Sequence, residues 1–313
     1  MQVTRLVAVV LAFIFVSSTT DSLTAQTITH VPLYTFHGDS AGDWFGHWAS
    51  GAGDLNGDGR ADLVVGAFRD DNNGINSGSV RVFSGSDGSV LLNVNGDSAG
   101  DGFGRSVNSA GDVNGDRTPD LIVGAHGDDN NGTGSGSIRV LSGSDGSVLH
   151  DFDGDDAGDE FGRSVSGAGD VNGDGFADLI VGAWFANDSG SARVLSGIDG
   201  SVLYNFDGDN AGDTFGVSVR GAGDVNGDGI DDLIVGARRG GANDGGYVRV
   251  FVSHISPCLL GDVDLSGTVD FLDIQPFIAV LSGRTNQCEA DCDQSGIVDF
   301  LDIQPFIEIL SSP

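Results

Sequence analysis

The sequence predicts an all-β fold, a β-propeller of four repeated blades, followed by a small α-helical calcium-binding module. Three observations lead to this prediction. A fifteen-residue segment recurs four times, beginning GDLNGDG at Gly53, GDVNGDR at Gly111 and GDVNGDG at both Gly169 and Gly223. Each copy lies among short apolar segments bounded by Gly, Asp, Asn and Ser, which is the signature of β-strands. After residue 257 the pattern changes to two acidic twelve-residue loops, each followed by an apolar stretch with helical spacing.

Each repeat carries four candidate strands in a fixed order, and the aspartate motifs start 58, 58 and 54 residues apart. In the third repeat the strands are GSVLHDF (146–152), FGRSV (161–165), DLIVGA (178–183) and SARVLSG (191–197). Four short strands repeated at this period predict a propeller blade. Because DLIVGA shows no polar alternation, we expect an inner strand buried on both faces. The Asp-Gly of SGSDGSV predicts a tight hairpin into the next repeat.

The two ends of the repeat region suggest how the array would close. Residues 31–38 (VPLYTFHG) match the first strand of a repeat, and residues 246–253 (GYVRVFVS) match the fourth. An N-terminal strand that completes the last blade would close a four-bladed ring over residues 30–254 and hide its sheet edges. An open stack of blades, or two chains forming an eight-bladed ring, is the structural alternative.

The charge of the chain excludes some classes of partner. There are 46 acidic residues against 14 basic ones, all arginine, and the formal net charge is −32. A field of that sign repels nucleic acid and anionic membrane surfaces, so we expect neither as a partner. Since 39% of the residues are hydrophobic and fall in regular runs, disorder does not explain the acidity. We therefore expect much of the charge to bind cations.

Residues 1–25 have the pattern of a secretory signal peptide. Arg5 precedes an apolar run over residues 6–16, and small polar residues lead to a cleavage site near Ala25. A run of eleven apolar residues is too short to span a bilayer, although a membrane anchor is the alternative interpretation. We expect a secreted or cell-surface protein whose mature chain does not insert into the membrane. One pair among Cys258, Cys288 and Cys292 would then form a disulfide and leave one thiol.

The repeated aspartate motif has the composition of a calcium loop. Oxygen-bearing side chains stand at positions 1, 3, 5 and 9, and a backbone carbonyl at position 7 would add a further ligand. The predicted side-chain ligands are Asp54, Asn56, Asp58, Asp62, Asp112, Asn114, Asp116, Asp120, Asp170, Asn172, Asp174, Asp178, Asp224, Asn226, Asp228 and Asp232. The carbonyls are those of Arg60, Thr118, Phe176 and Ile230. The alternative is that these residues only form turns without a metal.

The second loop departs from the others, because Arg117 stands where they have glycine at position 6. We expect backbone strain and a weaker calcium site there.

The pattern FG followed by GDxNGDGxxDLxVGA resembles the FG-GAP repeat of integrin α-chain propellers and of many bacterial exported proteins. The resemblance covers about 225 residues and recurs four times. It implies a propeller whose calcium loops are the four aspartate motifs. Integrin heads have seven blades, so an array of four departs from them in closure and in any integrin-like ligand site.

A second motif, GDxAGDxFG, also recurs in every repeat. It supplies the pairs Asp39/Asp43, Asp97/Asp101, Asp155/Asp159 and Asp209/Asp213. These pairs could ligate additional cations. We favour the interpretation that they accept hydrogen bonds from backbone amides in the turn before each FG strand.

The C-terminal segment, residues 258–313, contains two loops with EF-hand spacing, DVDLSGTVDFLD and DCDQSGIVDFLD. The predicted ligands are Asp262, Asp264, Ser266, Asp270, Asp273, Asp291, Asp293, Ser295, Asp299 and Asp302, with the carbonyls of Thr268 and Ile297. Two loop-helix units with Asp at position 12 resemble dockerin modules, which implies a cohesin-like partner. Phe271, Leu272, Phe300 and Leu301 would either contact that partner or fill the small core between the two helices.

The segments after each GA differ most between repeats and should lie at the end of the blades opposite the aspartate loops. They carry Phe68, Arg69, His126, Trp184, Phe185, Arg238 and Arg239, and Trp44 should approach the same face. Trp44, Trp184 and Arg238 are our candidate ligand contacts, and aromatic packing under the loops themselves is the alternative.

The sequence thus favours an exported calcium-binding adhesion or scaffold protein, in which the propeller binds a ligand or partner and the C-terminal module docks to another protein. We find no catalytic constellation, since there are only three glutamates and no HExxH or GxSxG motif, and we expect no enzyme. The alternatives are a carbohydrate-active enzyme, a polysaccharide-binding accessory protein, or a purely structural surface protein.

Overall fold

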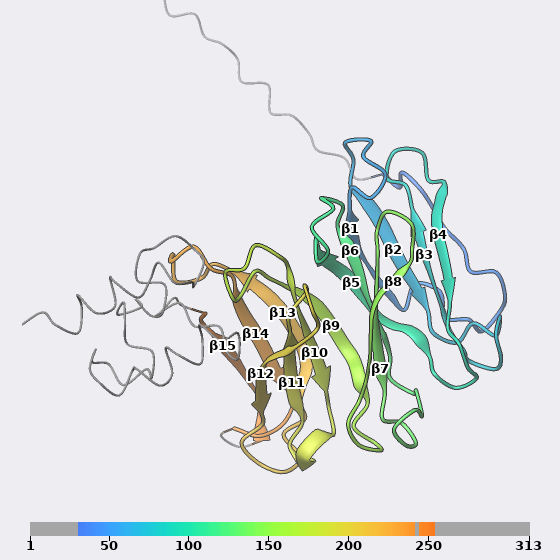
Figure 1. Cartoon of the computed structure of the whole chain (residues 1–313). Helices are drawn as coiled ribbons and strands as arrows, with labels where there is room; N and C mark the ends of the chain where they lie inside the picture. Colours follow the sequence, from blue (N-terminus) through green and yellow to red (C-terminus); the bar gives the residue numbers. More distant parts are fainter. Residues whose placement is uncertain (1–30, 242–243, 254–313) are drawn as a thin grey trace, which may run out of the picture. The chain divides into compact units, whose positions relative to one another are not determined.

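The computed structural model describes residues 31–241 and 244–253 of the 313-residue chain. The all-β prediction is confirmed over these ranges, because fifteen strands form four separate antiparallel sheets (Figure 1). The helical element among the described residues is a short 3-10 turn at Ala186–Asp188. None of the helical structure in the described ranges is long and apolar enough to cross a membrane.

Each sheet is a meander whose strands follow one another in sequence order. The first sheet contains β1 (Trp48–Gly53), β2 (Asp62–Ala67), β3 (Ser79–Phe83) and β4 (Val90–Asn95). The second contains β5 (Phe103–Gly111), β6 (Asp120–Ala125), β7 (Ser137–Leu141) and β8 (Val148–Asp153). The third contains β9 (Phe161–Gly169), β10 (Asp178–Ala183), β11 (Ser191–Leu195) and β12 (Val202–Asp207). The fourth contains three strands, β13 (Phe215–Gly223), β14 (Asp232–Ala237) and β15 (Tyr247–Phe251).

The predicted Asp-Gly hairpins are confirmed, but the predicted order of strands within a blade is wrong by one strand. The sequence periodicity predicts GSVL as the first strand of its repeat, whereas in the structure it begins the outer, fourth strand of the preceding sheet. In the first sheet Val82 pairs with Leu92 across β3 and β4, and the Ser84 amide donates to the Ser89 carbonyl at 2.8 Å. A tight turn forces the strands on its two sides to pair with each other, and they must therefore share one sheet.

The prediction that DLIVGA is an inner, buried strand is confirmed. Every residue of β6 and of β10 is buried, and these strands lie between two hydrogen-bonded neighbours. At the first sheet the pattern is interrupted, because Leu63 of β2 is 38% exposed. The continuous apolar run therefore reflects packing on both faces of the strand, which occurs only where another sheet covers each face.

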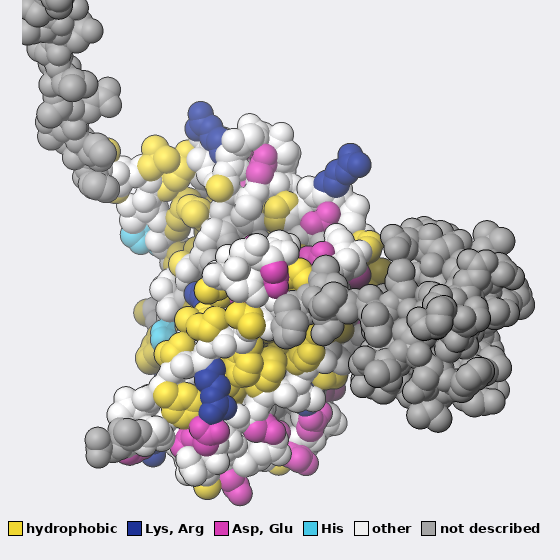
Figure 2. Space-filling model, turned by 90° about the vertical axis from the view of Figure 1, so that its left-hand side faces the viewer, with side chains coloured by type: hydrophobic (Ala, Val, Ile, Leu, Met, Phe, Trp, Pro, Cys, Tyr) yellow, Lys and Arg dark blue, Asp and Glu magenta, His cyan; other side chains and the backbone are white. Residues whose placement is uncertain are grey.

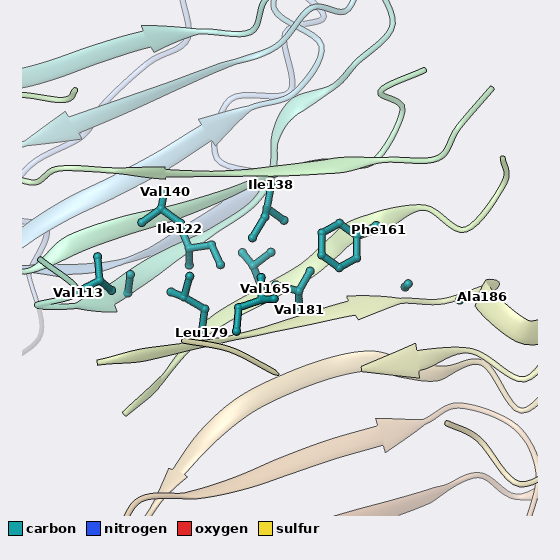
Figure 3. Close-up of a cluster of buried hydrophobic side chains, with 12 residues drawn as sticks. Val113, Ile122, Ile138, Val140, Phe161, Val165, Leu179, Val181 and Ala186 are labelled. Atoms are coloured by element: carbon teal, nitrogen blue, oxygen red, sulfur yellow. The ribbon is translucent and has the colours of Figure 1, made fainter. Parts of the chain in front are cut away.

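The hydrophobic core consists of three clusters, each formed between two consecutive sheets. One cluster joins the first and second sheets, one joins the second and third, and one joins the third and fourth. Figure 3 shows the middle cluster, in which Ile122 and Ile138 of the second sheet face Phe161 and Leu179 of the third. The four sheets are therefore stacked in sequence order through three interfaces.

Consecutive sheets approach each other backbone to backbone at the glycines of the two repeated motifs. A β-carbon added to Gly124 of the GA motif would lie 1.8 Å from the carbonyl oxygen of Gly162, the FG glycine of the next sheet. The same approach occurs at Gly66 with 2.1 Å to Gly104, and at Gly182 with 2.0 Å to Gly216. No other residue type fits at such a distance. The glycines of the GA and FG motifs are therefore the points at which neighbouring sheets make contact.

Among the described residues the two end sheets lack this glycine contact on their outer sides, and closure into a ring, by one chain or by two, stays a prediction. Gly46, the first FG glycine, has no atom within 4 Å of an added β-carbon. Gly236, the last GA glycine, meets only atoms of its own sheet, at 3.7 Å or more. Residues 31–36, assigned to a unit separate from 37–313, form no strand. Their apolar alternation suits an outer strand but does not specify which edge it pairs with.

The fourth sheet consequently ends at β15, and its outer surface carries exposed apolar side chains. Val248 is 62% exposed and Val250 is 49% exposed, while a shallow groove beside them is lined by Phe206 and Phe251, whose ring centroids are 3.8 Å apart. Figure 2 views the protein from the side of this sheet and shows hydrophobic side chains gathered there.

Equivalent glycines at an internal interface and at the open end should respond differently to alanine. We expect Gly124→Ala to lower the free energy of unfolding by about 3 kcal/mol, because its β-carbon would overlap the Gly162 carbonyl. The matched variant Gly236→Ala should change it by less than about 1 kcal/mol, since no neighbouring sheet contacts that position. Urea unfolding of both variants measures the difference. Equal losses at the two positions would show that a further sheet covers Gly236.

Candidate functional site

The four aspartate loops occupy one end of the sheets, where each joins the first strand of its sheet to the second, the inner DLIVGA strand. In the third loop the Gly175 amide donates to Asp170 Oδ2, the Asp174 amide to Asn172 Oδ1 and the Phe176 amide to Asp174 Oδ1, each at 2.9 Å. The other three loops repeat these bonds with small differences. The side chains at positions 1, 3 and 5 thus form the turns of their own loop.

The aspartate at position 9 has a different environment, because it is the first residue of the inner buried strand. Asp62, Asp120, Asp178 and Asp232 are all fully buried. Asp120 Oδ2 accepts a hydrogen bond from the Val113 amide and Oδ1 accepts one from the Gly143 amide, both at 3.0 Å. The carboxylate therefore ties the aspartate loop to the end of the third strand of the same sheet.

Burial raises the pKa of Asp120 and of Asp178 to about 6, and the negative charges of the loop aspartates at positions 1 and 5 contribute to the rise. These charges are Asp116 and Asp112 around Asp120. A cation in the loop would offset this repulsion, and each carboxylate oxygen retains a second lone pair.

The donor types of the loops fit calcium, which takes carboxylate and amide oxygens in flexible geometry. Over residues 31–241 and 244–253, however, no group of three or more His, Cys, Asp or Glu side chains is arranged around a point that a metal could occupy. The predicted position-7 carbonyl residues lie in the same loops, between positions 5 and 9. The predicted loops at Asp262 and Asp291, with Phe271, Leu272, Phe300 and Leu301, lie outside the described residues.

The second loop is strained where the sequence predicted it. Arg117 has a φ of +71°, the left-handed region that glycine occupies at the same position of the other loops, for example +84° at Gly59. A side chain in this region costs about 1 kcal/mol.

The interpretation of the GDxAGD motif as a turn is confirmed for the second aspartate in three of the four repeats. The second aspartate accepts the amide three residues before it, from Ser40 to Asp43 at 2.8 Å and from Ser98 to Asp101 at 3.0 Å. The first aspartate makes an ion pair that the sequence analysis missed, with an arginine of the third strand. These pairs are Asp39–Arg81, Asp97–Arg139, Asp155–Arg193 and Asp209–Arg249. The arginine at the same place in every repeat was the available signal.

The segments after each GA lie at the opposite end of the sheets from the aspartate loops, as predicted. The end of the GA strand pairs with the start of the FG strand in each sheet, for example Ala125 with Phe103. Trp44 lies against Phe68, with ring centroids 5.4 Å apart, and the Arg69 guanidinium lies 4.3 Å from the centre of the Trp44 ring. Trp44 is still 49% exposed.

Trp184 and Arg238, the other two candidate ligand contacts, come together across the third and fourth sheets. The Arg238 guanidinium lies 5.6 Å from the centre of the Trp184 ring. Phe185, next in the chain, is 48% exposed, whereas Phe68 is 8% exposed and packs beneath its neighbours. Phe68 therefore packs beneath the loops, as the alternative interpretation predicts, whereas Trp44 and Phe185 are exposed and ligand contact stays a prediction for them.

Sequence reasoning missed two residues of this face, Arg105 and Arg163. Each follows the FG dipeptide directly and its guanidinium covers an aromatic ring from a GA segment, Phe68 at 5.4 Å and Trp184 at 4.0 Å. His126 lies between them: burial, together with the positive charges of Arg105 and Arg163, lowers the pKa of its imidazole to about 4. The sequence signal that could have identified them is the residue after FG, which is His47, Arg105, Arg163 and Val217 in the four repeats in turn.

The neutral state of His126 makes stability depend on pH. The pKa of His126 in the folded protein is about 4, below the ordinary value of 6.5. The neutral imidazole therefore makes its full contribution to the free energy of unfolding above pH 6.5, and this contribution is lost as the pH falls toward 4. We expect His126→Gln to remove up to about 3 kcal/mol of this pH dependence. Urea unfolding of the wild type and the variant between pH 4 and 7 measures the difference, and two parallel profiles would contradict it.

Comparison with known proteins identifies the repeats. FG-GAP repeats match residues 45–83, 103–141, 161–195 and 215–251. No curated protein matches the chain. Among solved structures, a rhamnogalacturonan lyase of Bacillus licheniformis has 18% identity and a TM-score of 0.39, covering 59% of this chain and 39% of that one. Sqt1 of Saccharomyces cerevisiae has 11% identity and a TM-score of 0.37, with 66% and 48% covered.

The Dos1 propeller has 15% identity and a TM-score of 0.35, covering 56% of this chain and 39% of that one. The chain spans less than half the length of each of these three structures. The four matched segments coincide with the first three strands of the four sheets in turn. The chain therefore carries four tandem segments that match the FG-GAP repeat, one in each of its four sheets.

Proposed function

We propose that this protein is an extracellular, calcium-stabilised scaffold that binds a ligand or partner through the loops after the GA motifs. One observation carries the proposal: the loops at one end of the sheets are nearly the same in every repeat, and those at the other end are not. The aspartate loops at one end are nearly identical in sequence and bonding, whereas the segments at the other end differ between repeats and present aromatic and arginine side chains. A rigid sheet with variable loops at one end is a common arrangement for binding.

Calcium is the proposed partner of the aspartate loops. Three carboxylates and one amide oxygen lie in each short loop, and the buried carboxylate at position 9 has a raised pKa in two of them. Bound calcium would supply the positive charge that these groups lack, and it would hold the loop against the third strand.

The proposals for the two ends of the chain rest on their sequence. Residues 1–25 would direct export, and residues 258–313 would bind calcium through two further loops and dock to a cohesin-like partner. The proposed role is binding without catalysis. Cleavage of a polysaccharide by the purified chain, detected as new reducing ends, would contradict that role and favour a carbohydrate-active enzyme.

Calcium should bind and stabilise the protein. We expect calorimetric titration of the EDTA-treated full chain to give about six sites, and saturation of each to add about 2.7 kcal/mol at one hundred times its dissociation constant. The double variant Asp170→Asn, Asp174→Asn should lose one site. The matched variant Asp199→Asn, an exposed aspartate of a hairpin, should lose none. An unchanged melting temperature with calcium would show that the aspartates only form turns.

The loop face should carry ligand binding. We expect an array of extracellular proteins and polysaccharides to capture the calcium-loaded chain, and Phe185→Ala to reduce the captured signal by about tenfold, as for an aromatic contact at an interface. Val148→Ala is the matched control, because Val148 is equally exposed but lies on the outer strand β8. Equal loss in both variants would place binding elsewhere, and the absence of any captured partner would favour a purely structural protein.

A further inference from the structure

A continuous group of basic and aromatic side chains crosses the loop face from the first sheet to the fourth. We call it the arginine–aromatic stripe. Its members follow the FG or GA dipeptides, so the register of each sheet brings them to the same edge. They are Phe68, Arg105, His126, Arg163, Trp184 and Arg238.

The arginines of the stripe differ from those of the third strands in their partners. Each third-strand arginine, such as Arg139, faces an aspartate supplied by its own repeat. Arg105 and Arg238 make no ion pair with any described residue, and Arg163 pairs with Glu160. In a chain with a net charge of −32, unpaired cations brought together at one edge are unusual.

Burial and neighbouring positive charge lower the pKa of arginines in the stripe. Desolvation lowers the pKa of Arg163, and the charges of Arg105 and Arg238 lower it further. Burial alone lowers the pKa of Arg105. An anion bound at this edge would offset both the burial and the mutual repulsion of the guanidinium groups.

Aromatic rings lie against the guanidinium groups of Arg105 and Arg163, and Arg163 is also held by Glu160. Arg163 lies 4.0 Å above the Trp184 ring and Arg105 lies 5.4 Å from the centre of Phe68. A guanidinium held by its face on an aromatic ring still directs N–H groups outward from its edge. Such edges match the two oxygens of a carboxylate or sulfate group.

Unsatisfied polar atoms gather at the same edge. Five buried side-chain nitrogen or oxygen atoms among the described residues have no hydrogen-bond partner, and four of them lie in or beside the stripe: His126 Nδ1, Arg163 Nε, Trp184 Nε1 and Thr214 Oγ1. Buried polar atoms are normally paired. The indole N–H of Trp184 can only donate, so its missing partner is an acceptor.

The backbone beside the stripe is strained as well. The residue before FG has a positive φ in all four repeats, and in three of them it is not glycine: Trp44 at +56°, Glu160 at +52° and Thr214 at +56°. Strained non-glycine residues cluster at binding sites. Here they direct side chains toward the start of the FG strands.

We propose that the arginine–aromatic stripe binds an oxyanion, a carboxylate or sulfate group carried by the ligand of the loop face. Arg105 and Arg163 contact the oxyanion, Trp184 Nε1 donates to it, and the exposed Trp44 contacts the remainder of the ligand. This inference rests on the proposed ligand-binding role of the face and names the chemistry of the ligand.

The test uses the calcium-loaded full chain and three probes at constant ionic strength: sodium D-glucuronate, sodium sulfate and D-glucose. Tryptophan fluorescence and calorimetry report binding. Glucuronate and glucose differ by a carboxylate, so we expect glucuronate to saturate the protein and glucose not to. Competition by sulfate would show that any oxyanion fits, and glucuronate binding without sulfate binding would assign the site to a sugar carboxylate.

Variants connect the binding to the stripe. We expect Arg105→Gln and Arg163→Gln each to weaken glucuronate binding by about tenfold, the loss typical of a charge-assisted hydrogen bond. Arg220→Gln is the matched control, an exposed arginine of β13 without an ion pair in the described chain, and it should change binding less than twofold. Arg105→Lys, which keeps the charge and loses the planar edge, should weaken binding even where its melting temperature equals that of the wild type.

Two results would overturn the inference: no binding of either anion, or equal binding by wild type and the Arg105 and Arg163 variants. Failure here is distinguishable from failure of the proposed function. If the array still captures a partner through the loop face while neither anion binds, the face binds a ligand of another chemistry. If the array captures nothing and the anions do not bind, both proposals fail.

Discussion

The contact on which the array depends is the approach of two glycine backbones between neighbouring sheets. The GA glycine of one sheet meets the FG glycine of the next so closely that a β-carbon would overlap a carbonyl oxygen. Serine side chains reinforce the contact, because Ser106 Oγ and Ser164 Oγ each donate at 2.7 Å to the carbonyl of the next FG glycine. With the backbones this near, the valine and isoleucine side chains on both sides meet in one buried cluster. The FG and GA dipeptides that define the repeat are therefore the residues through which neighbouring sheets make contact.

Charge is organised by the same repetition. Each repeat has one buried aspartate that accepts hydrogen bonds from two backbone amides at one end of the sheet. Each repeat also has one ion pair between an aspartate and an arginine of the third strand. The pairs are half exposed, so each contributes little to stability. Their main effect is to occupy arginines that would otherwise be free. Of the two arginines after FG, Arg163 pairs with Glu160 and Arg105 makes no ion pair with a described residue, so unpaired positive charge remains beside the variable loops.

Local features of the fold followed from the sequence. The strands, the Asp-Gly hairpins and the burial of DLIVGA depend on residues adjacent in the chain, and all were predicted. The assignment of the GSVL strand was wrong, since periodicity alone does not say where one blade ends. Closure stays a prediction for a related reason: Gly46 and Gly236 meet no neighbouring sheet of the described chain, yet their sequence context is the same as that of glycines that do.

The candidate site was predicted in part for similar reasons. Trp44, Trp184 and Arg238 stand in segments that visibly differ between repeats, which made them candidates. Arg105 and Arg163 stand inside the regular FG strand and look like ordinary strand residues. Only the register of the sheet shows that each reaches a ring from the GA segment. Hydrogen bonding within the aspartate loops could be anticipated from turn chemistry, whereas the burial of Asp62 and its equivalents required the packed sheet.

The sequential order of the three interfaces has a consequence for how the chain folds. Every buried cluster joins sheets that are neighbours in the sequence, so each new sheet can dock as soon as it has formed. An array of this kind can nucleate at any repeat and extend from it in either direction, without the slow step of bringing the chain ends together. Repeats added or lost at either end would alter the length of the stack while leaving its internal joints intact.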